Sequence, residues 1–403
     1  MVLWLSPLAA AQDFKIFDRT VQVHGFASQG YVYTAGNNWL TMHSDGDGSP
    51  GYTDFGLNMS VPLTDRLRVG AQVYDRNLGQ LGQYHPSLDW AVADFRLKSW
   101  LGIRAGKVKT TIGLFNDTED QDFLRVFALL PQSVYPTDLR ESTIAHVGGD
   151  VYGAVSPLHR LGEFFYTAYT GHRDDGKYSG STFLTVQYGI RGASFKSWQA
   201  GADLRWQTPV KGLLVGASRL NEISTDKGTV SNPLEMGQYV GYRADSKSDW
   251  QNQFYGEYVR GKLRIDSEFY HTRLQLDDKV EGVLAAVTDS DVISWYASGT
   301  YRLAKRLAVG SYYSHFTIKS LGSGPLAILF PSGTDTSLPA NHVYDKVISG
   351  RIDLTKFWNV KLEGHFIDGY GSGLSTDGFY PQVNPGGFKH TTNALVIRTS
   401  VYF

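Results

Sequence analysis

Cysteine is absent from this chain of 403 residues. Its absence excludes disulfide bonds, thiolate catalysis and zinc sites built on cysteine. Charged residues are sparse, at 19% of the chain, and nearly balanced, with a net charge of −1, so nothing indicates a nucleic-acid partner. No apolar run approaches the roughly 20 residues that a membrane-spanning helix needs. That last absence does not exclude a β-barrel, because barrel strands alternate and give a weak hydropathy signal.

Tyrosine and glycine are abundant instead, with 24 and 44 residues. Aromatic side chains favour half-buried strands, and glycine favours the tight turns between them. A chain of this length could hold two or three ordinary domains, but a β-barrel often uses as many residues in one domain.

Strict alternation of apolar and polar residues recurs along the chain and predicts strands. Between residues 67 and 76, for example, Leu67, Val69 and Val73 share one face, and Gln72 and Arg76 share the other. The pattern predicts about sixteen strands, with short turns at one rim and long polar loops at the other, including loops at 220–249 and 276–291. An even number of strands with this arrangement of loops is typical of a transmembrane antiparallel β-barrel, so we predict an all-β fold of that class.

The two faces of the predicted strands indicate which solvent each side meets. Leu362 and Phe366 share an apolar face, and Lys361, Glu363 and His365 share the opposite one. Charge inside and apolar residues outside are the reverse of a soluble barrel. We also expect Leu263 on the apolar face near the middle of the membrane, where a substitution by arginine would block assembly.

Residues 107–143 form the longest segment without alternation in the first half of the chain. Four acids open it, and an apolar run follows that ends at Pro131. Thr118 and Gln121 have the spacing of a capping box, which predicts the start of a short helix. We expect this segment to be a constriction loop that folds into the barrel and narrows it.

The first eleven residues are apolar and end in Ala9, Ala10 and Ala11. This pattern resembles the end of a secretory signal peptide with cleavage before Gln12. We therefore predict a signal-peptide remnant at 1–11 and a single barrel domain at 12–403.

The last predicted strand, 393–403, ends in Phe403, with Val401, Ile397 and Leu395 at alternate positions before it. It resembles the C-terminal signature of Gram-negative outer-membrane barrels, which the barrel assembly machinery recognises. Together with the strand count and the long third loop, it resembles the sixteen-stranded porin family. The resemblance implies a place in the outer membrane of a Gram-negative bacterium, contact with its lipids, a homotrimer and passage of small hydrophilic solutes and ions.

In that family the acids of the third loop face a cluster of arginines on the pore wall. The resemblance gives the loop role here to Asp117, Glu119, Asp120 and Asp122. By alternation, the candidate arginines of the wall are Arg68, Arg96, Arg104, Arg264, Arg302, Arg351 and Arg398. Opposed charges across a narrow wet passage would set up a transverse field and tune ion selectivity.

Three other functions remain open: a substrate-selective porin for phosphate, sugar or a carboxylate, an outer-membrane enzyme, and a structural barrel with a plugged lumen. No G-x-S-x-G motif occurs, and His146 with Asp150 on one polar strand face is ordinary lumen polarity. The eleven histidines show no ligand spacing, so we predict no metal site and no cofactor. Our first interpretation is a passive diffusion channel without catalysis.

Overall fold

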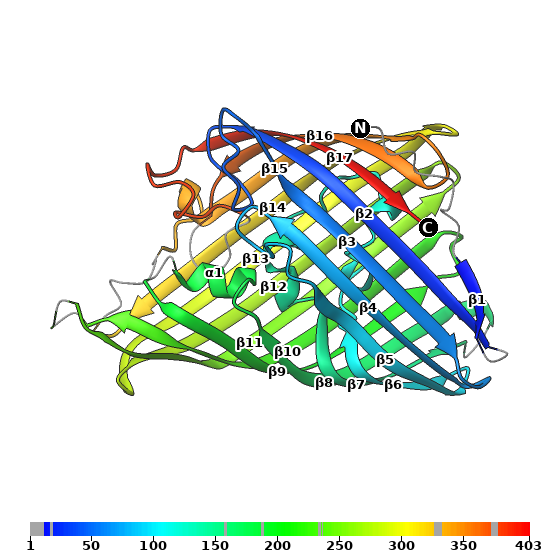
Figure 1. The fold of residues 1–403 in the computed structure, drawn as a ribbon, viewed down its shortest axis with the longest axis horizontal. Helices are drawn as coiled ribbons and strands as arrows, with labels where there is room; N and C mark the ends of the chain where they lie inside the picture. The colour runs from blue at the N-terminus through cyan, green and yellow to red at the C-terminus, as the bar shows by residue number, and fades with distance from the viewer. Residues whose placement is uncertain are drawn as a thin grey trace.

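The computed structural model describes residues 12–403 apart from 17–18, 157–158, 187–188, 233–234, 236, 326–332 and 372–377. Strands β2 to β17 follow one another as antiparallel neighbours, and β17 pairs with β2, so these sixteen strands close into a barrel (Figure 1). A further short strand, β1, pairs with the start of β2 as a hairpin. The predicted fold class is confirmed. The signal-peptide prediction for residues 1–11 lies outside the described part of the chain.

The strands are β1 Gln12–Ile16, β2 Arg19–Ala35, β3 Ser49–Pro62, β4 Leu67–Leu78, β5 Ser87–Lys98, β6 Leu101–Lys109, β7 Ala145–Val155, β8 Glu163–Asp175, β9 Arg191–Gln207, β10 Leu213–Ser231, β11 Tyr239–Arg260, β12 Leu263–Val280, β13 Val283–Ala304, β14 Leu307–Ser323, β15 His342–Asp353, β16 Trp358–Gly369 and β17 Thr391–Tyr402. The helices are short: η1 Asn116–Thr118, η2 Asp122–Leu124, η3 Thr137–Ser142, η4 His159–Leu161, α1 Gly180–Val186 and η6 Pro339–Asn341. No helix in the described ranges has the length and apolar character to cross a membrane.

The alternating faces of the strands lie as the sequence predicts. On β16, Lys361 is fully buried in the barrel, whereas its neighbour Leu362 is 54% exposed on the outside. An apolar exterior around a charged interior is the arrangement of a membrane-spanning barrel. The position of Leu263 differs from the prediction, because it is the first residue of β12 and follows the two-residue turn 261–262, so it lies at the rim and not at mid-membrane.

Two of the predicted long loops are wrong. Residues 220–249 lie mostly in β10 and β11, which pair out to Ser231 and Tyr239, and residues 276–291 lie mostly in β12 and β13. A two-residue turn, Glu281 and Gly282, joins β12 to β13, and both residues have positive φ. The sequence misled because alternation is lost at these strand ends: residues 224–227 are polar on both faces and residues 283–287 are apolar on both. Backbone hydrogen bonds sustain a strand without alternation.

Residues 110–144, called loop 3 here, connect β6 to β7 and fold into the lumen. Their middle is buried, including Leu129 and Leu130. The loop holds η1, η2 and η3. The capping prediction is wrong, because Thr118 ends η1 and its hydroxyl donates to the carbonyl oxygen of Phe115, at 3.3 Å. The loop begins three residues later than predicted, because β6 continues to Lys109.

Candidate functional site

Asp122 in loop 3 lies between two cations of the barrel wall. Lys361 on β16 and Arg398 on β17 are directly opposite in the strand register. The Asp122 carboxylate is 3.1 Å from Lys361 Nζ and 3.2 Å from Arg398 Nε. Ser400 also donates to it, at 2.7 Å. Like charges opposite each other destabilise a sheet, and Asp122 relieves this repulsion together with Asp54 on β3, which pairs with Arg398 at 2.6 Å. Burial acts to raise the pKa of Asp122, but Arg398 and Lys361 outweigh it and lower that pKa.

The backbone of the same loop segment is bound to this wall as well. Glu363 on β16 accepts hydrogen bonds from the backbone N–H groups of Ala128 and Leu129, at 2.8 and 3.0 Å. Arg351 on β15 donates to the carbonyl oxygens of Phe123 and Arg125, at 2.5 and 3.0 Å. Charge-assisted bonds of this kind are the stronger class of hydrogen bond, so β15, β16 and β17 hold the loop firmly.

On the other side of the lumen, Glu268 on β12 binds the loop. Its carboxylate accepts from the Tyr135 hydroxyl at 2.6 Å and from the Leu114 backbone N–H at 3.0 Å. Two wall groups, Tyr296 and Gln253, donate to the same carboxylate, at 2.7 and 2.5 Å. Loop 3 therefore crosses the barrel and is bound at both ends of its path.

A third set of contacts joins loop 3 to β4, β5 and β6. Arg140 pairs with Asp89 through both guanidinium nitrogens, at 2.9 and 3.0 Å. Asp120 pairs with Lys109 at 2.7 Å and accepts from Gln72 at 2.6 Å. With contacts on three sides, the loop crosses and divides the lumen.

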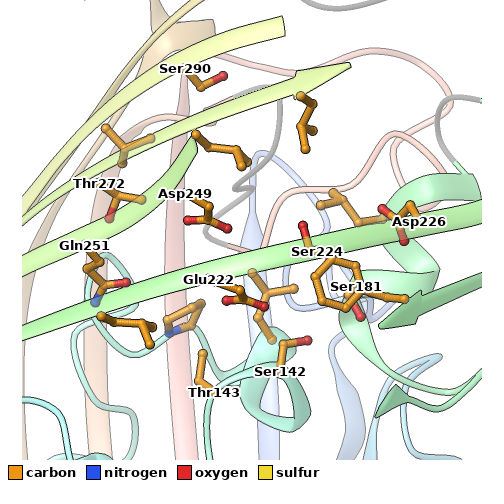
Figure 2. A pocket seen from close by; sticks show the side chains of 18 of the residues that line it. Ser142, Thr143, Ser181, Glu222, Ser224, Asp226, Asp249, Gln251, Thr272 and Ser290 are labelled. Carbon is orange, nitrogen blue, oxygen red and sulfur yellow. The ribbon is translucent and has the colours of Figure 1, made fainter. Parts of the chain in front are cut away.

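A cavity of about 350 Å³ lies beside loop 3, against the strands from β8 to β14 (Figure 2). Four carboxylates line it: Glu222, Asp226, Asp249 and Asp278. Among the described lining residues the only Lys or Arg is Arg173, which pairs with Glu222 at 2.9 Å. Serine and threonine hydroxyls complete much of its polar surface, including those of Ser142 on loop 3 and Ser181 on α1 (Figure 2). The cavity therefore has a largely apolar lining in which the charged groups are four carboxylates and one arginine.

The structure brings some of the predicted site residues together. Asp122 meets Arg398, and Arg351 binds the loop backbone. Arg264 lies over the ring of Phe115 in the loop, 5.2 Å from its centroid, and pairs with Glu257 and Asp266 on the wall. Asp122, Arg351 and Arg398 thus fix the loop in place.

Other predicted wall residues have partners elsewhere. Arg104 pairs with Asp150 at 2.8 Å, Arg68 donates to Gln22 at 2.8 Å, and Arg302 lies 3.6 Å from Asp353. The side chain of Arg96 is exposed. These described contacts are within the wall and its turns, at a distance from the loop acids.

The two remaining loop acids, Asp117 and Glu119, are partly exposed. Burial in the loop raises the pKa of Glu119 to about 7, despite the opposing charge of nearby Arg140 and Arg125. Glu119 therefore changes charge near neutral pH, which the tightly paired Asp122 does not.

Several residues of the site were not singled out from the sequence. Alternation placed Lys361, Glu363 and Glu268 in the lumen, but it gives no sign of which loop groups they meet. Asp226 and Asp249 were assigned to an outer loop at 220–249, so their place on the lumen wall was missed. The density of acids in 222–249 was the available signal.

Neither a protein-family model nor a curated protein matches this chain. Solved structures do match over nearly all of its length. The outer-membrane protein OmpT of Vibrio cholerae is 14% identical, covers 97% of this chain and all of its own, and has a TM-score of 0.55; a trimer form of OmpT gives 0.53 over 96% of this chain and 99% of its own.

Two further channels are similar. The outer membrane channel DcaP of Acinetobacter baumannii is 13% identical, with a TM-score of 0.55 over 97% of this chain and 99% of its own. An anion-selective porin from Comamonas acidovorans is 11% identical, with a TM-score of 0.54 over 96% and 100%. At these identities the likeness concerns the fold, and the chain has the fold of the bacterial outer-membrane porins.

Proposed function

We propose that this protein is a passive diffusion channel in the outer membrane of a Gram-negative bacterium, and that it favours cations over anions. The observation that carries the proposal is the acid-lined cavity beside the anchored loop 3. A diffusing ion that enters between loop 3 and the strands β8 to β14 meets Asp226, Asp249 and Asp278 with few basic groups near them. Rings of one charge sign raise the local concentration of the opposite ion and so tune selectivity.

The acids that line this cavity also favour some of the alternative substrates over others. A phosphate or carboxylate channel needs cations along its path, and two of the basic groups that contact loop 3, Lys361 and Arg398, are already bound to its acid. A channel for small cationic or neutral hydrophilic solutes fits the cavity better. The proposal involves no catalysis and no cofactor.

Within this proposal the predicted constriction residues divide into two groups. Asp120 and Asp122 hold loop 3 in place through their ion pairs. Asp117 and Glu119 are partly exposed and act on the passing ion directly. Among the arginines, we assign Arg351 and Arg398 to anchoring and Arg264 to the space below the loop, where it lines a smaller cavity of about 60 Å³.

The test is the reversal potential of the refolded protein in a planar bilayer under a potassium chloride gradient. We expect a reversal potential whose sign shows a preference for cations. The double substitution Asp226→Asn with Asp249→Asn should reduce its size. Asp174→Asn is the matched control, because Asp174 is exposed, pairs with Lys196 and does not line the cavity. An anion-selective potential would contradict the proposal, and a well-folded but silent protein would indicate a plugged structural barrel.

We further propose a homotrimer surrounded by outer-membrane lipids, as the trimer form of OmpT supports by analogy of fold. Conductance that appears in groups of three equal steps would agree with it. Recognition of Phe403 by the barrel assembly machinery stays a prediction. In the structure the backbone of Phe403 exchanges two hydrogen bonds with Gly25 of β2, at 2.9 and 3.2 Å, so the last residue takes part in closing the barrel.

A further inference from the structure

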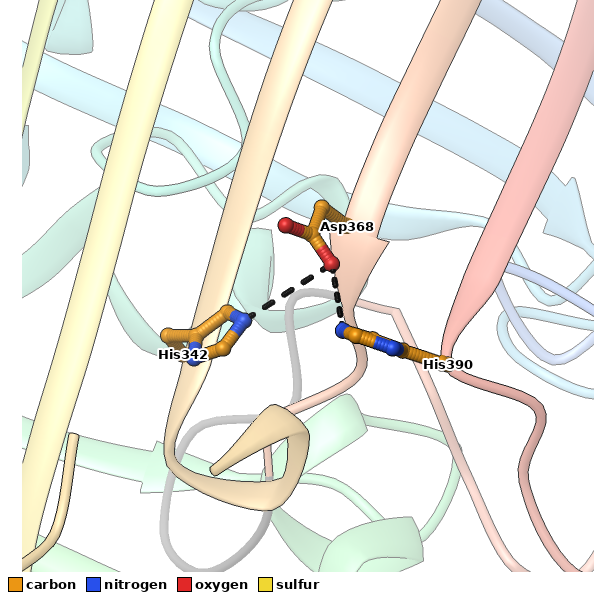
Figure 3. A group of neighbouring side chains, drawn as sticks. All are labelled: His342, Asp368 and His390. Atoms are coloured by element: carbon orange, nitrogen blue, oxygen red, sulfur yellow. Dashed lines mark ion pairs between the residues drawn. The ribbon is translucent and has the colours of Figure 1, made fainter. Parts of the chain in front are cut away.

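Three potential metal ligands meet at the loop rim of the barrel, outside the lumen. His342 is the first residue of β15, Asp368 is near the end of β16, and His390 directly precedes β17. One ligand atom from each lies within 4.8 Å of the others. The nearest atoms are His390 Nε2 and Asp368 Oδ1 at 2.7 Å, and His342 Nε2 is 3.9 Å from the same oxygen (Figure 3). We propose that these side chains bind a divalent transition-metal ion, best represented by zinc.

The tautomer of His342 suits a metal ligand. Its Nδ1 lies 2.9 Å from the carbonyl oxygen of Thr336, which can only accept, so Nδ1 carries the proton and Nε2 presents its lone pair. Histidine ligands of metals commonly donate their second ring nitrogen to a backbone carbonyl in this way. Nε2 is buried, has no hydrogen-bond partner among the described residues, and points toward Asp368 and His390 (Figure 3).

The surrounding structure also holds the ligands in place. The His342 ring stacks on Tyr344 with centroids 4.3 Å apart and nearly parallel planes. The backbone N–H of Gly369 donates to the carbonyl oxygen of His390 at 2.8 Å, and that of Gly371 donates to the carbonyl of His342 at 3.1 Å. Neighbouring strands therefore fix the backbone of all three ligands before any ion binds.

The donor set selects the class of ion. Two imidazoles and one carboxylate suit zinc and its neighbours, whereas calcium and magnesium prefer oxygen ligands. Tetrahedral zinc with bonds of about 2.0 to 2.2 Å separates its ligands by about 3.3 Å, so the pairs at 2.7 and 3.9 Å need small side-chain rotations only. The Asp368 and His390 side chains are 49% and 61% exposed, which leaves room for water as a fourth ligand.

The site is separate from the proposed channel. Asp368 and His342 alternate with the buried lumen residues Ile367 and Val343, so they lie on the outer side of the wall. An ion here would join the end of residues 324–341 to the end of residues 370–390, the connections before β15 and before β17. Its presence or absence can therefore be tested without reference to conduction.

The test is isothermal titration of the full refolded chain in detergent micelles with zinc chloride alone, after treatment with a chelator. We expect one zinc ion per chain and no saturable binding of calcium. His390→Ala and Asp368→Asn should weaken binding at least about tenfold, and both side chains are exposed enough for the variants to fold. Cobalt should give the intense visible absorption of a tetrahedral complex in the unaltered chain and lose it in His390→Ala.

The matched control is His24→Ala, because His24 is an exposed histidine outside this ligand group. Zinc binding should be unchanged in it. Absence of saturable zinc binding by the unaltered chain would overturn the inference, and so would equal binding by His390→Ala and Asp368→Asn.

Discussion

The barrel has two unlike walls. Strands β15, β16 and β17 have 12 residues each, and we call them the short wall; β10 to β13 have 18 to 22 residues, and we call them the long wall. The short wall presents three cations to the lumen, Arg351, Lys361 and Arg398, and binds the acid and backbone of loop 3. The long wall carries carboxylates along the cavity that the loop leaves open.

This difference shows how one charged lumen serves two purposes. Buried opposite charges in direct contact fix a loop, because removing one partner leaves an uncompensated charge. Carboxylates that line an open cavity would be available to passing ions. The acids that the sequence drew attention to, such as Asp122, are mainly structural, and the acids that we assign to conduction lie on the opposite wall.

The largest effect should come from a charge on the outside of the short wall. Leu362 lies in the middle of β16 and faces outward, so Leu362→Arg places a charge at mid-membrane at a cost of about 2–4 kcal/mol. We expect failure to insert into lipid vesicles, measured by heat-modifiable gel mobility. Leu263→Arg is the matched control, because Leu263 lies at the rim, and it should insert nearly normally. Equal insertion of both variants would contradict the assigned depths.

The second-largest effect should come from removal of Asp122, the acid that anchors loop 3. Asp122→Asn leaves Lys361 and Arg398 facing each other, and breaking a buried ion pair of this kind costs about 3–5 kcal/mol. We expect a lower midpoint in guanidinium unfolding and larger fluctuations of the open-channel current. Asp117→Asn removes a partly exposed acid of the same loop and should leave the midpoint nearly unchanged. If both variants unfold alike, the anchoring role of Asp122 is wrong.

The contact of loop 3 with Glu268 on the long wall should contribute less to the stability of the barrel. The Glu268 carboxylate accepts four hydrogen bonds. In Glu268→Gln the amide NH₂ group takes the place of one carboxylate oxygen, and it cannot accept the bonds that this oxygen accepted. Leaving buried donors unpaired costs about 1–3 kcal/mol. We expect a smaller loss of unfolding free energy than in Asp122→Asn, measured by the same titration. A larger loss would reverse the ranking of the two walls.

The smallest effect should be a pH dependence of selectivity. Because burial raises the pKa of Glu119 to about 7, its side chain is mostly neutral at pH 6 and mostly ionised at pH 8. The added negative charge should increase cation preference over that interval, measured as a shift in reversal potential. The shift should be smaller in Glu119→Gln. A shift of the same size in that variant would assign it to another group.

The sequence predicted the wall of the barrel better than its contents. Period-two alternation correctly placed Lys361 and Glu363 inside and Leu362 and Phe366 outside, because the pleat alone decides the face. It failed at the loop-side ends of β10 to β13, where apolar and polar residues no longer alternate. The register of Lys361 against Arg398 was available only once the β16–β17 pairing was known.

The contacts of loop 3 and the rim site depend on long-range closure of the chain. Asp122 meets Lys361 across more than two hundred residues, and no local spacing encodes that distance. Likewise His342, Asp368 and His390 come from three segments whose ends the strand pairing brings together. Local motifs describe ligands on one helix or one loop, so a site shared by three strand ends has no local signature.

Passage of ions through the acid-lined cavity beside loop 3 can be tested by chemical modification of its wall. Because the chain has no cysteine, Asp249→Cys creates a single reactive thiol on the long wall. The measurement is single-channel current before and after a positively charged methanethiosulfonate reagent is added, with Asp174→Cys as the control. We expect a stepwise fall in current for Asp249→Cys and none for the control. Full modification of Asp249→Cys, confirmed by mass, with unchanged current and selectivity would contradict it.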